Sequence, residues 1–205
     1  MPDAPLVWID CEMTGLDLTN DALIEVACIV TDAELKPLGT GVNVVIKPSA
    51  AALEGMGDFV RAMHVKSGLL PELDGGMTMA DAQHQLMDYV KAQIGSIRAP
   101  LAGNTVGMDK AFLDRDMPEL MALLHYRVVD VSSIKELVRR WYPRVFFNAP
   151  TKTGGHRAMG DIEDSIQELR YYRETVFTPL PGPDSDAAKA AAAVVTEQSP
   201  PPNGH

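Results

Sequence analysis

The chain has 205 residues, a length that suggests one domain with enough apolar side chains for a buried core. Its formal net charge of −10 argues against a broad electrostatic grip on long DNA or RNA, because such a grip needs many Lys and Arg contacts to phosphate. The charge does not exclude a short or metal-held nucleic acid, and no apolar run approaches the roughly 20 residues of a membrane-spanning helix, so no membrane partner is expected.

The first part of the chain is rich in Val and Ile and predicts three strands. These strands cover residues 5–11, 22–31 and 41–47. Short links rich in turn residues, such as Thr19-Asn20-Asp21, favour an antiparallel meander at the start of a sheet.

The same region bears on the compartment of the protein. The N-terminal segment MPDAPLVWID has no basic stretch, so a secretory signal is not expected. The only two cysteines, Cys11 and Cys28, lie inside predicted strands. This usage favours a reduced, cytoplasmic protein without a disulfide framework.

From residue 80 onward, apolar side chains recur at helical spacing. Helices are predicted over 80–94, 109–115, 118–124, from Ser132 or Ser133 to Tyr142, and over 159–177. Short strands are predicted at 99–103 and 126–131. Strands followed by alternating helices and strands indicate an α/β fold with a mixed sheet flanked by helices.

The composition changes at Thr178. The following segment is rich in Pro and Ala, and no aromatic residue occurs after Phe177. We therefore expect a domain over 1–177 and a disordered tail over 178–205.

Two acids, Asp10 and Glu12, stand two residues apart inside the apolar run PLVWIDCEM. On a strand, residues i and i+2 point to the same face, so the two carboxylates project side by side. Two carboxylates at such a short distance raise each other's pKa unless a cation lies between them. Carboxylate oxygens are hard ligands, which suit Mg²⁺ or Mn²⁺. The alternative is a pair of acids at a strand end that face solvent.

Further acids occur in two glycine-containing segments. GNTVGMD ends in Asp109 at a predicted helix start, where the residue is either a ligand at the sheet edge or a helix N-cap. GGHRAMGD places His156 five residues before Asp161. A helix that begins near His156 would point both side chains in the same general direction; the alternative for each is ordinary surface chemistry.

These segments together resemble one known family. IDCEMTGLD, GNTVGMD, HYRVVDVSSIKEL and TKTGGHRAMGDIEDSIQELRYYR are similar to the oligoribonuclease family of the DEDDh exonucleases, over roughly residues 5–177. The resemblance implies an RNase H-like mixed five-stranded sheet flanked by helices. It also implies 3′-to-5′ hydrolysis of short oligoribonucleotides, chiefly dinucleotides, to 5′-mononucleotides.

The resemblance assigns the acids and the histidine to catalysis. Asp10, Glu12, Asp109 and Asp161 would hold two divalent cations, Mg²⁺ or Mn²⁺, that activate water and stabilise the leaving oxygen. His156 would be the general base, because imidazole exchanges protons near neutral pH.

The resemblance also assigns substrate contacts near the 3′ end. Leu16 would wedge between the last two bases, Gly15 would allow close backbone approach, and Thr14 would lie near the terminal ribose. Phe59 and His64 would lie beside the bases; Phe59 stands where related sequences often carry Trp, and keeps a stacking face. The alternatives are a plain turn with Leu16 over the core, and core packing of Phe59.

A second group of residues would close the site around the 5′ phosphate. Thr105, Arg127 and Ser132 would contact that phosphate, for which the planar fork of Arg is suited. Tyr126 would reach the active site of a partner subunit, which implies a homodimer; the alternative is a strand tyrosine with its hydroxyl in water.

Two other functions stay open at this point. One is a proofreading-type DNA exonuclease, against which the HYR segment and the short single-domain chain argue. The other is a non-catalytic nucleic-acid-binding module, against which the presence of all four acids and His156 argues.

Overall fold

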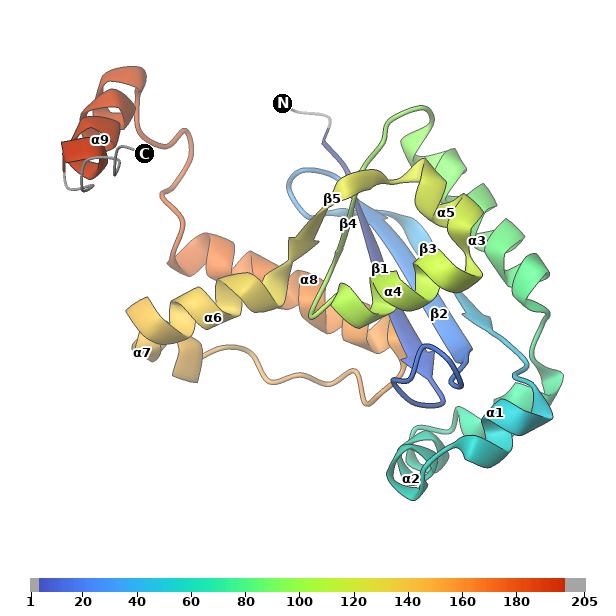
Figure 1. Ribbon diagram of the computed structural model, residues 1–205. Helices are drawn as coiled ribbons and strands as arrows, with labels where there is room; N and C mark the ends of the chain where they lie inside the picture. The colour runs from blue at the N-terminus through green and yellow to red at the C-terminus, as the bar shows by residue number, and fades with distance from the viewer. Residues whose placement is uncertain (1–3, 198–205) are drawn as a thin grey trace, which may run out of the picture.

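The computed structural model describes residues 4–197, and a five-stranded mixed sheet forms its centre (Figure 1). The strands are β1 (Leu6–Met13), β2 (Leu23–Thr31), β3 (Pro37–Val45), β4 (Pro100–Gly103) and β5 (His125–Asp130). Their order is β3-β2-β1-β4-β5; the first three are antiparallel neighbours, and β4 runs parallel to β1 and β5. The predicted α/β fold with a mixed sheet is therefore confirmed.

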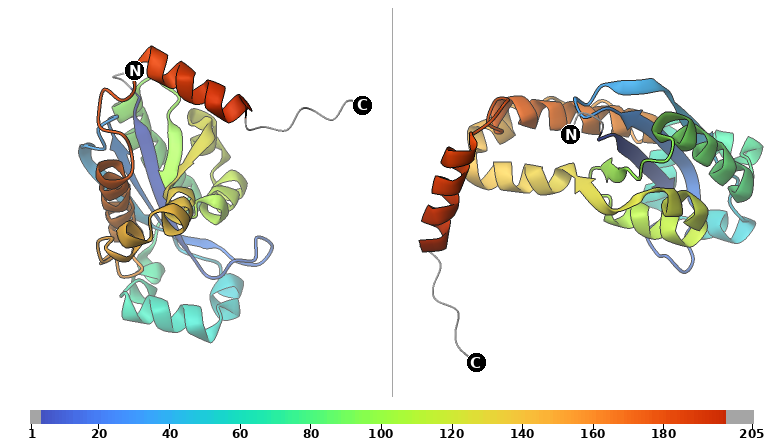
Figure 2. Two further views of the ribbon diagram at one scale, coloured as in Figure 1. Left: turned by 90° about the vertical axis from the view of Figure 1, so that its left-hand side faces the viewer. Right: turned by 90° about the horizontal axis from the view of Figure 1, so that it is seen from above.

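Helices cover both faces of this sheet (Figures 1 and 2). One face packs against α3 (Met79–Ile94), α4 (Gly107–Asp116) and α5 (Pro118–Leu123). The other packs against α6 (Val131–Trp141) and α8 (Ala158–Thr175), and α7 (Pro143–Phe147) extends α6. Because both faces are covered, β2 is buried at every position, which explains its nearly continuous apolar sequence.

A helical segment that the sequence pattern did not predict separates β3 from α3. It contains α1 (Ala50–Gly55), α2 (Asp58–Lys66) and the 3₁₀ helix η1 (Leu70–Gly75). We call residues 50–75 the helical lobe. Its small apolar core of Met56, Leu69 and Leu73 packs on Ile24, so the lobe is fixed beside the end of β2.

The helices begin close to the predicted positions, with one different cap. α6 begins at Val131, because the Asp130 carboxylate accepts a hydrogen bond from the Ser132 amide and caps the helix. Ser132 and Ser133 are therefore not the capping residues. α8 begins at Ala158 and runs along the sheet.

The C-terminal segment differs in part from the expected disordered tail. A helix, α9, covers Ser185–Glu197, and its side chains are exposed. Its run of alanines has the highest intrinsic helix propensity, which explains helix formation without tertiary packing. Residues 198–205 lie outside the described residues, and the domain boundary at 178 stays a prediction. Within residues 4–197, no helix has the length and apolar character needed to cross a bilayer.

Candidate active site

Three carboxylates meet at one end of β1. Asp10 and Glu12 project from the same face of β1, and Asp161 lies in the first turn of α8. One carboxylate oxygen from each of these three residues lies within 4.8 Å of the other two. We call Asp10, Glu12 and Asp161 the carboxylate cluster. The predicted side-by-side projection of Asp10 and Glu12 is thus what the strand produces.

The electrostatics of the cluster favour a bound cation. Burial, with added repulsion from the neighbouring acids, raises the pKa of Asp10 to about 9 and that of Glu12 to about 8. Burial is also the main cause that raises the pKa of Asp161. A divalent cation would remove this repulsion, and an all-carboxylate donor set is the kind that hard cations prefer.

Asp109 lies beside the cluster in the first turn of α4. Its charge raises the pKa of Asp10, while burial raises its own pKa to about 6. Its Oδ1 accepts a hydrogen bond of 3.0 Å from the amide of Cys11, which fixes the carboxylate against β1. The alternative reading of Asp109 as the helix N-cap is wrong, because Val106 occupies that position.

His156 lies in a loop before α8, in an exposed position. Its φ of 61° is in the left-handed region, and Gly155 precedes it at 69°. The helix begins at Ala158, two residues after His156 and one residue before the predicted start at 159. The imidazole is still close enough to Asp161 to lower the pKa of that carboxyl.

We call residues 151–157 the histidine loop, and buried acids hold it on both sides. Asp164 accepts hydrogen bonds from the amides of Thr153 and Gly154 at 2.6 and 2.7 Å. A Cβ on Gly154 would lie 2.3 Å from the Asp161 carboxylate, so this glycine permits close approach to the cluster. Gly154 thus allows the histidine loop to pack closely against Asp161.

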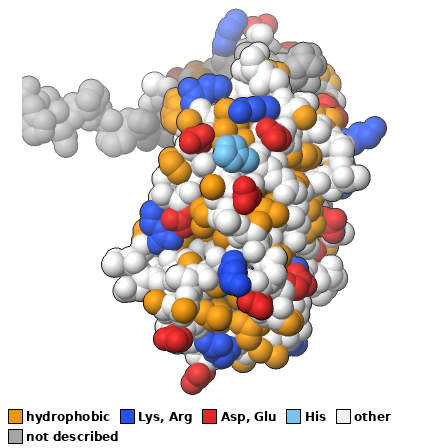
Figure 3. Space-filling view, turned by 90° about the vertical axis from the view of Figure 1, so that its right-hand side faces the viewer, with side chains coloured by type: hydrophobic (Ala, Val, Ile, Leu, Met, Phe, Trp, Pro, Cys, Tyr) orange, Lys and Arg blue, Asp and Glu red, His pale blue; other side chains and the backbone are white. Residues whose placement is uncertain are grey.

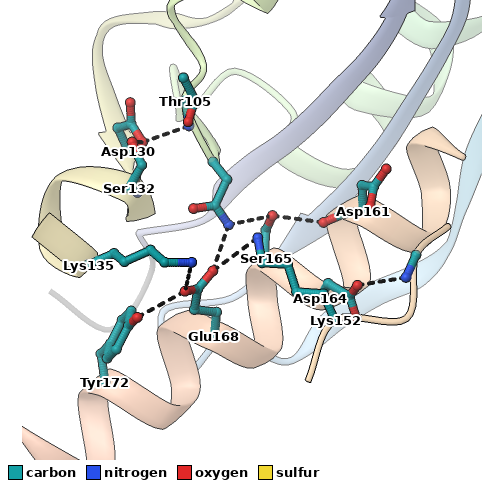
Figure 4. A network of polar contacts seen from close by, with 12 residues as sticks. Thr105, Asp130, Ser132, Lys135, Lys152, Asp161, Asp164, Ser165, Glu168 and Tyr172 are labelled. Carbon is teal, nitrogen blue, oxygen red and sulfur yellow. Dashed lines mark hydrogen bonds and ion pairs between the residues drawn. The ribbon is translucent and has the colours of Figure 1, made fainter. Parts of the chain in front are cut away.

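A buried polar network connects α8 to the ends of β4 and α6 (Figure 4). Glu168 accepts from Tyr172 and Asn104 and pairs with Lys135 and Lys152. Ser165 donates to the backbone carbonyl of Asp161 at 2.7 Å and accepts from Asn104. The network therefore fixes the start of α8, and with it one member of the carboxylate cluster.

The residues expected near the bases lie on the loop after β1 and on the helical lobe. Leu16 is 69% exposed and Phe59, on α2 of the helical lobe, is 82% exposed. The alternatives of a core-covering Leu16 and a core-packed Phe59 are therefore wrong. Thr14 is buried; its hydroxyl donates to Asp21 and accepts from the Ala22 amide, and so fixes the loop that carries Leu16.

His64 has an unusual environment. Its side chain is fully buried, and Nε2 lies 3.0 Å from the Met13 carbonyl. A carbonyl only accepts, so Nε2 carries the proton. Nδ1 has no hydrogen-bond partner within the described part of the chain and lies 4.0 Å from Glu12 Oε2. An unpaired buried nitrogen beside the carboxylate cluster is costly unless a ligand hydroxyl reaches it.

The expected phosphate contacts form a second group. The Thr105 amide and the Ser132 hydroxyl both donate to Asp130, at 2.9 and 2.6 Å, so these two residues meet at the start of α6 (Figure 4). Tyr126 and Arg127 lie on the edge strand β5, where Tyr126 is 76% exposed and the Arg127 guanidinium lies 5.6 Å from its ring centroid.

Sequence reasoning missed several residues that shape the site. Glu25 on β2 lies opposite Glu12 and is fully buried, and Arg157 pairs with it. A lone acid in the apolar strand ALIEVACIVT was the available signal for Glu25. Asp164 and Asp21 have no such local signal, because each bonds to a loop several residues away.

Comparisons with known proteins give consistent matches. The family model described as Exonuclease matches residues 7–169. An oligoribonuclease of Streptomyces griseus is 63% identical, over 92% of this chain and 94% of that protein. Oligoribonucleases of Cutibacterium acnes and Mycobacterium avium are 58% and 53% identical, over at least 92% of this chain and at least 90% of each.

Solved structures with a similar fold are exonucleases. An exonuclease I from Methylocaldum szegediense has a TM-score of 0.64 at 19% identity, over 84% of this chain and 41% of that chain. A zinc-bound E. coli exonuclease I complex with single-stranded DNA has a TM-score of 0.65 at 14% identity, over 85% and 41%. The chain thus spans about two fifths of these larger proteins. At this identity the likeness concerns the fold, and it supports the expected RNase H-like arrangement.

Proposed function

The chain belongs to the oligoribonuclease family of 3′-to-5′ exoribonucleases, and from this premise we propose that it hydrolyses short oligoribonucleotides, chiefly dinucleotides, to 5′-mononucleotides. The observation that carries the proposal is the carboxylate cluster, with Asp109 and His156 beside it. Acids from three distant parts of the chain meet there, and a bound cation would offset the repulsion between their ionised forms.

The four acids would hold divalent cations, Mg²⁺ or Mn²⁺. Such ions would neutralise the scissile phosphate and acidify the attacking water. The protein's part is to keep the acids in place: the Cys11 amide orients Asp109, and the Ser165 hydroxyl fixes the backbone of Asp161. These hydrogen bonds come from the protein's own backbone and side chains, so they would hold the acids in position for the reaction.

His156 would accept the proton of the attacking water. Its exposed loop would let the imidazole pass that proton to solvent. The left-handed backbone at His156, next to Gly155, directs the loop over the start of α8.

The substrate would be bound through its last two nucleotides. Leu16 would separate the two bases and Phe59 would stack on one of them, which accounts for two large apolar side chains left exposed. The unpaired Nδ1 of His64 would accept a hydrogen bond from a hydroxyl of the terminal ribose. Gly15 has no Cβ, so the backbone of this loop can lie directly against Asp21, which would leave room for the ribose to approach.

The 5′ phosphate would meet Thr105, Ser132 and Arg127, and Tyr126 would come from the partner subunit of a homodimer. The edge strand β5, with the exposed Tyr126 and Val128, supports an interface on this side. We also expect the protein to act in the cytoplasm, in line with its two free, buried cysteines.

The charge distribution also supports a short substrate. On the face shown in Figure 3, Lys and Arg alternate with Asp and Glu among apolar side chains instead of forming a basic track. Long nucleic acids need such a track for affinity at ordinary salt. A dinucleotide needs only the local contacts described above.

The test is hydrolysis of 5′-labelled RNA of graded length, from two to ten nucleotides, with single-stranded DNA of the same lengths in parallel. We expect the highest kcat/KM on dinucleotides, and a strong preference for long DNA would refute the proposal. His156→Asn and Asp10→Ala should each lower kcat at least about a hundredfold, with Glu163→Gln, on the exposed side of α8, as the matched control.

The partner-subunit assignment has a separate test. Tyr126→Ala and Asp10→Ala subunits, each nearly inactive alone, should regain activity when mixed and allowed to exchange, because a mixed dimer would contain one complete site. Absence of recovery in a verified mixed dimer would contradict the contribution of Tyr126 across the interface.

A further inference from the structure

Arg157 joins three parts of the protein that are far apart in the sequence. Its Nε and Nη2 donate to Oε1 of Glu25 at 3.0 and 2.8 Å. Its Nη1 and Nη2 donate to the two carboxylate oxygens of Glu72 at 3.0 and 2.9 Å. One guanidinium therefore binds an acid of the central sheet and an acid of the helical lobe at the same time.

Glu25 is a rigid anchor for this arrangement. Its side chain is fully buried on β2, where its oxygens also accept from the Asn43 side chain and the Ala158 amide. The Ala158 contact is at the first residue of α8, so Glu25 holds both the side chain of Arg157 and the backbone that follows it. A buried carboxylate with these four donors has little freedom to move.

Glu72 brings the helical lobe to the same point. It lies on η1, in the lobe that carries Phe59 and His64 on α2. Arg157 itself is the N-cap residue of α8 and follows His156 directly. The side chain that anchors the histidine loop is thus the one that binds the lobe.

We propose that Arg157 is a positioning residue that holds the histidine loop and the helical lobe in one fixed relation through its shared pairs with Glu25 and Glu72. The inference rests on the proposed roles of His156 in proton transfer and of the lobe in binding the bases. A substrate seated against the lobe is then presented to His156 at a set distance. Because misplacement of a reacting group by about 1 Å costs up to a hundredfold in rate, such a link affects kcat and not only binding.

The chain supplies a matched control on the same 3₁₀ helix. Asp74, two residues after Glu72, pairs with Lys47 at 2.8 Å and ties the lobe to the end of β3, away from the histidine loop. Glu72→Gln removes a partly exposed ion pair of the lobe, and Asp74→Asn removes a more exposed one. Only Glu72→Gln removes a contact to Arg157.

The experiment measures kcat and KM for a dinucleotide with both variants, with thermal unfolding as a check on folding. Glu72→Gln should lower kcat about fivefold, and Asp74→Asn should leave kcat within about a factor of 1.5 of the wild-type value. Arg157→Lys keeps a charge near Glu25 but lacks the fork for two carboxylates, so it should lower kcat at least about tenfold. Equal kcat values for Glu72→Gln and Asp74→Asn would overturn the inference.

A His156→Asn variant in the same series separates this inference from the proposed function. If His156→Asn keeps the wild-type rate, the assignment of the general base fails, whatever Glu72→Gln does. If His156→Asn is inactive while Glu72→Gln matches Asp74→Asn, only the positioning role of Arg157 fails.

Discussion

Binding of a divalent cation to the carboxylate cluster should release about two protons at pH 7. The pKa of Asp10 is raised to about 9 and that of Glu12 to about 8, whereas that of Asp109 is raised only to about 6. At pH 7, Asp10 is then almost fully protonated, Glu12 is about nine-tenths protonated and Asp109 is about one-tenth protonated. A bound cation requires these three acids ionised, so about two protons leave from them, and any proton on Asp161, whose pKa burial also raises, would add to the count.

The proton count has two measurable consequences. In isothermal titration with Mg²⁺ or Mn²⁺, the apparent enthalpy plotted against the ionisation enthalpy of the buffer should have a slope near two across PIPES, HEPES and Tris. The affinity should rise about a hundredfold from pH 6.5 to pH 7.5. Since the acids titrate together, the count belongs to the cluster and not to one residue.

A matched variant controls for surface acids. Glu163→Gln removes an exposed carboxylate from α8 near the cluster and should leave the slope near two. A slope below about 0.5 for the wild-type protein, with an affinity that does not change with pH, would refute the reasoning. The acids would then be ionised before the metal binds, and their burial would not have the effect assigned to it.

Three further predictions follow from the same structure. The raised pKa values of Asp10 and Glu12 mean that the folded, metal-free protein binds more protons than the unfolded chain. Its unfolding temperature in EDTA should therefore fall from pH 5 to pH 9, and saturating Mg²⁺ should largely abolish this fall. A rise of the unfolding temperature over this range would contradict the prediction. Gly15→Ala places a Cβ 2.3 Å from the Asp21 carboxylate, so KM for dinucleotides should rise about tenfold in steady-state kinetics, and a KM within twofold of wild type would count against the packing argument. The indole N–H of Trp8 donates to the fully buried Thr31 hydroxyl at 3.0 Å, and Trp8→Phe removes this donor. The free energy of unfolding, measured in urea, should therefore fall by about 2 kcal/mol. A loss under about 0.5 kcal/mol would show that the hydroxyl finds another partner.

The sheet and the acids on it could be predicted because they depend on short-range periodicity. Alternation along a strand determines which side chains share a face, so Asp10 and Glu12 had to project together. The apolar run of β2 and the apolar stripe of α8 likewise predicted a strand and a helix that pack on the core. A local pattern suffices wherever the partner of a residue lies within a few positions.

Long-range pairs could not be predicted in this way. Arg157 and Glu25 are 132 residues apart, and the local sequence around either residue does not indicate that the two pair. The helical lobe was missed for a related reason: its three helices are short, and its small core depends on Ile24 of β2. The prediction of a disordered tail gave too little weight to the high helix propensity of the alanines in α9.

The exposed position of His156 has a practical consequence. The residue lies outside the apolar core, and Asn adopts its left-handed backbone about as readily as His does. A His156→Asn protein would therefore keep its fold and the carboxylate cluster while losing the proposed proton acceptor. Such a protein is a capture reagent: added to a cell extract, it would retain the short RNAs that the wild-type protein destroys. Mass spectrometry of the retained molecules would then identify the natural substrates directly.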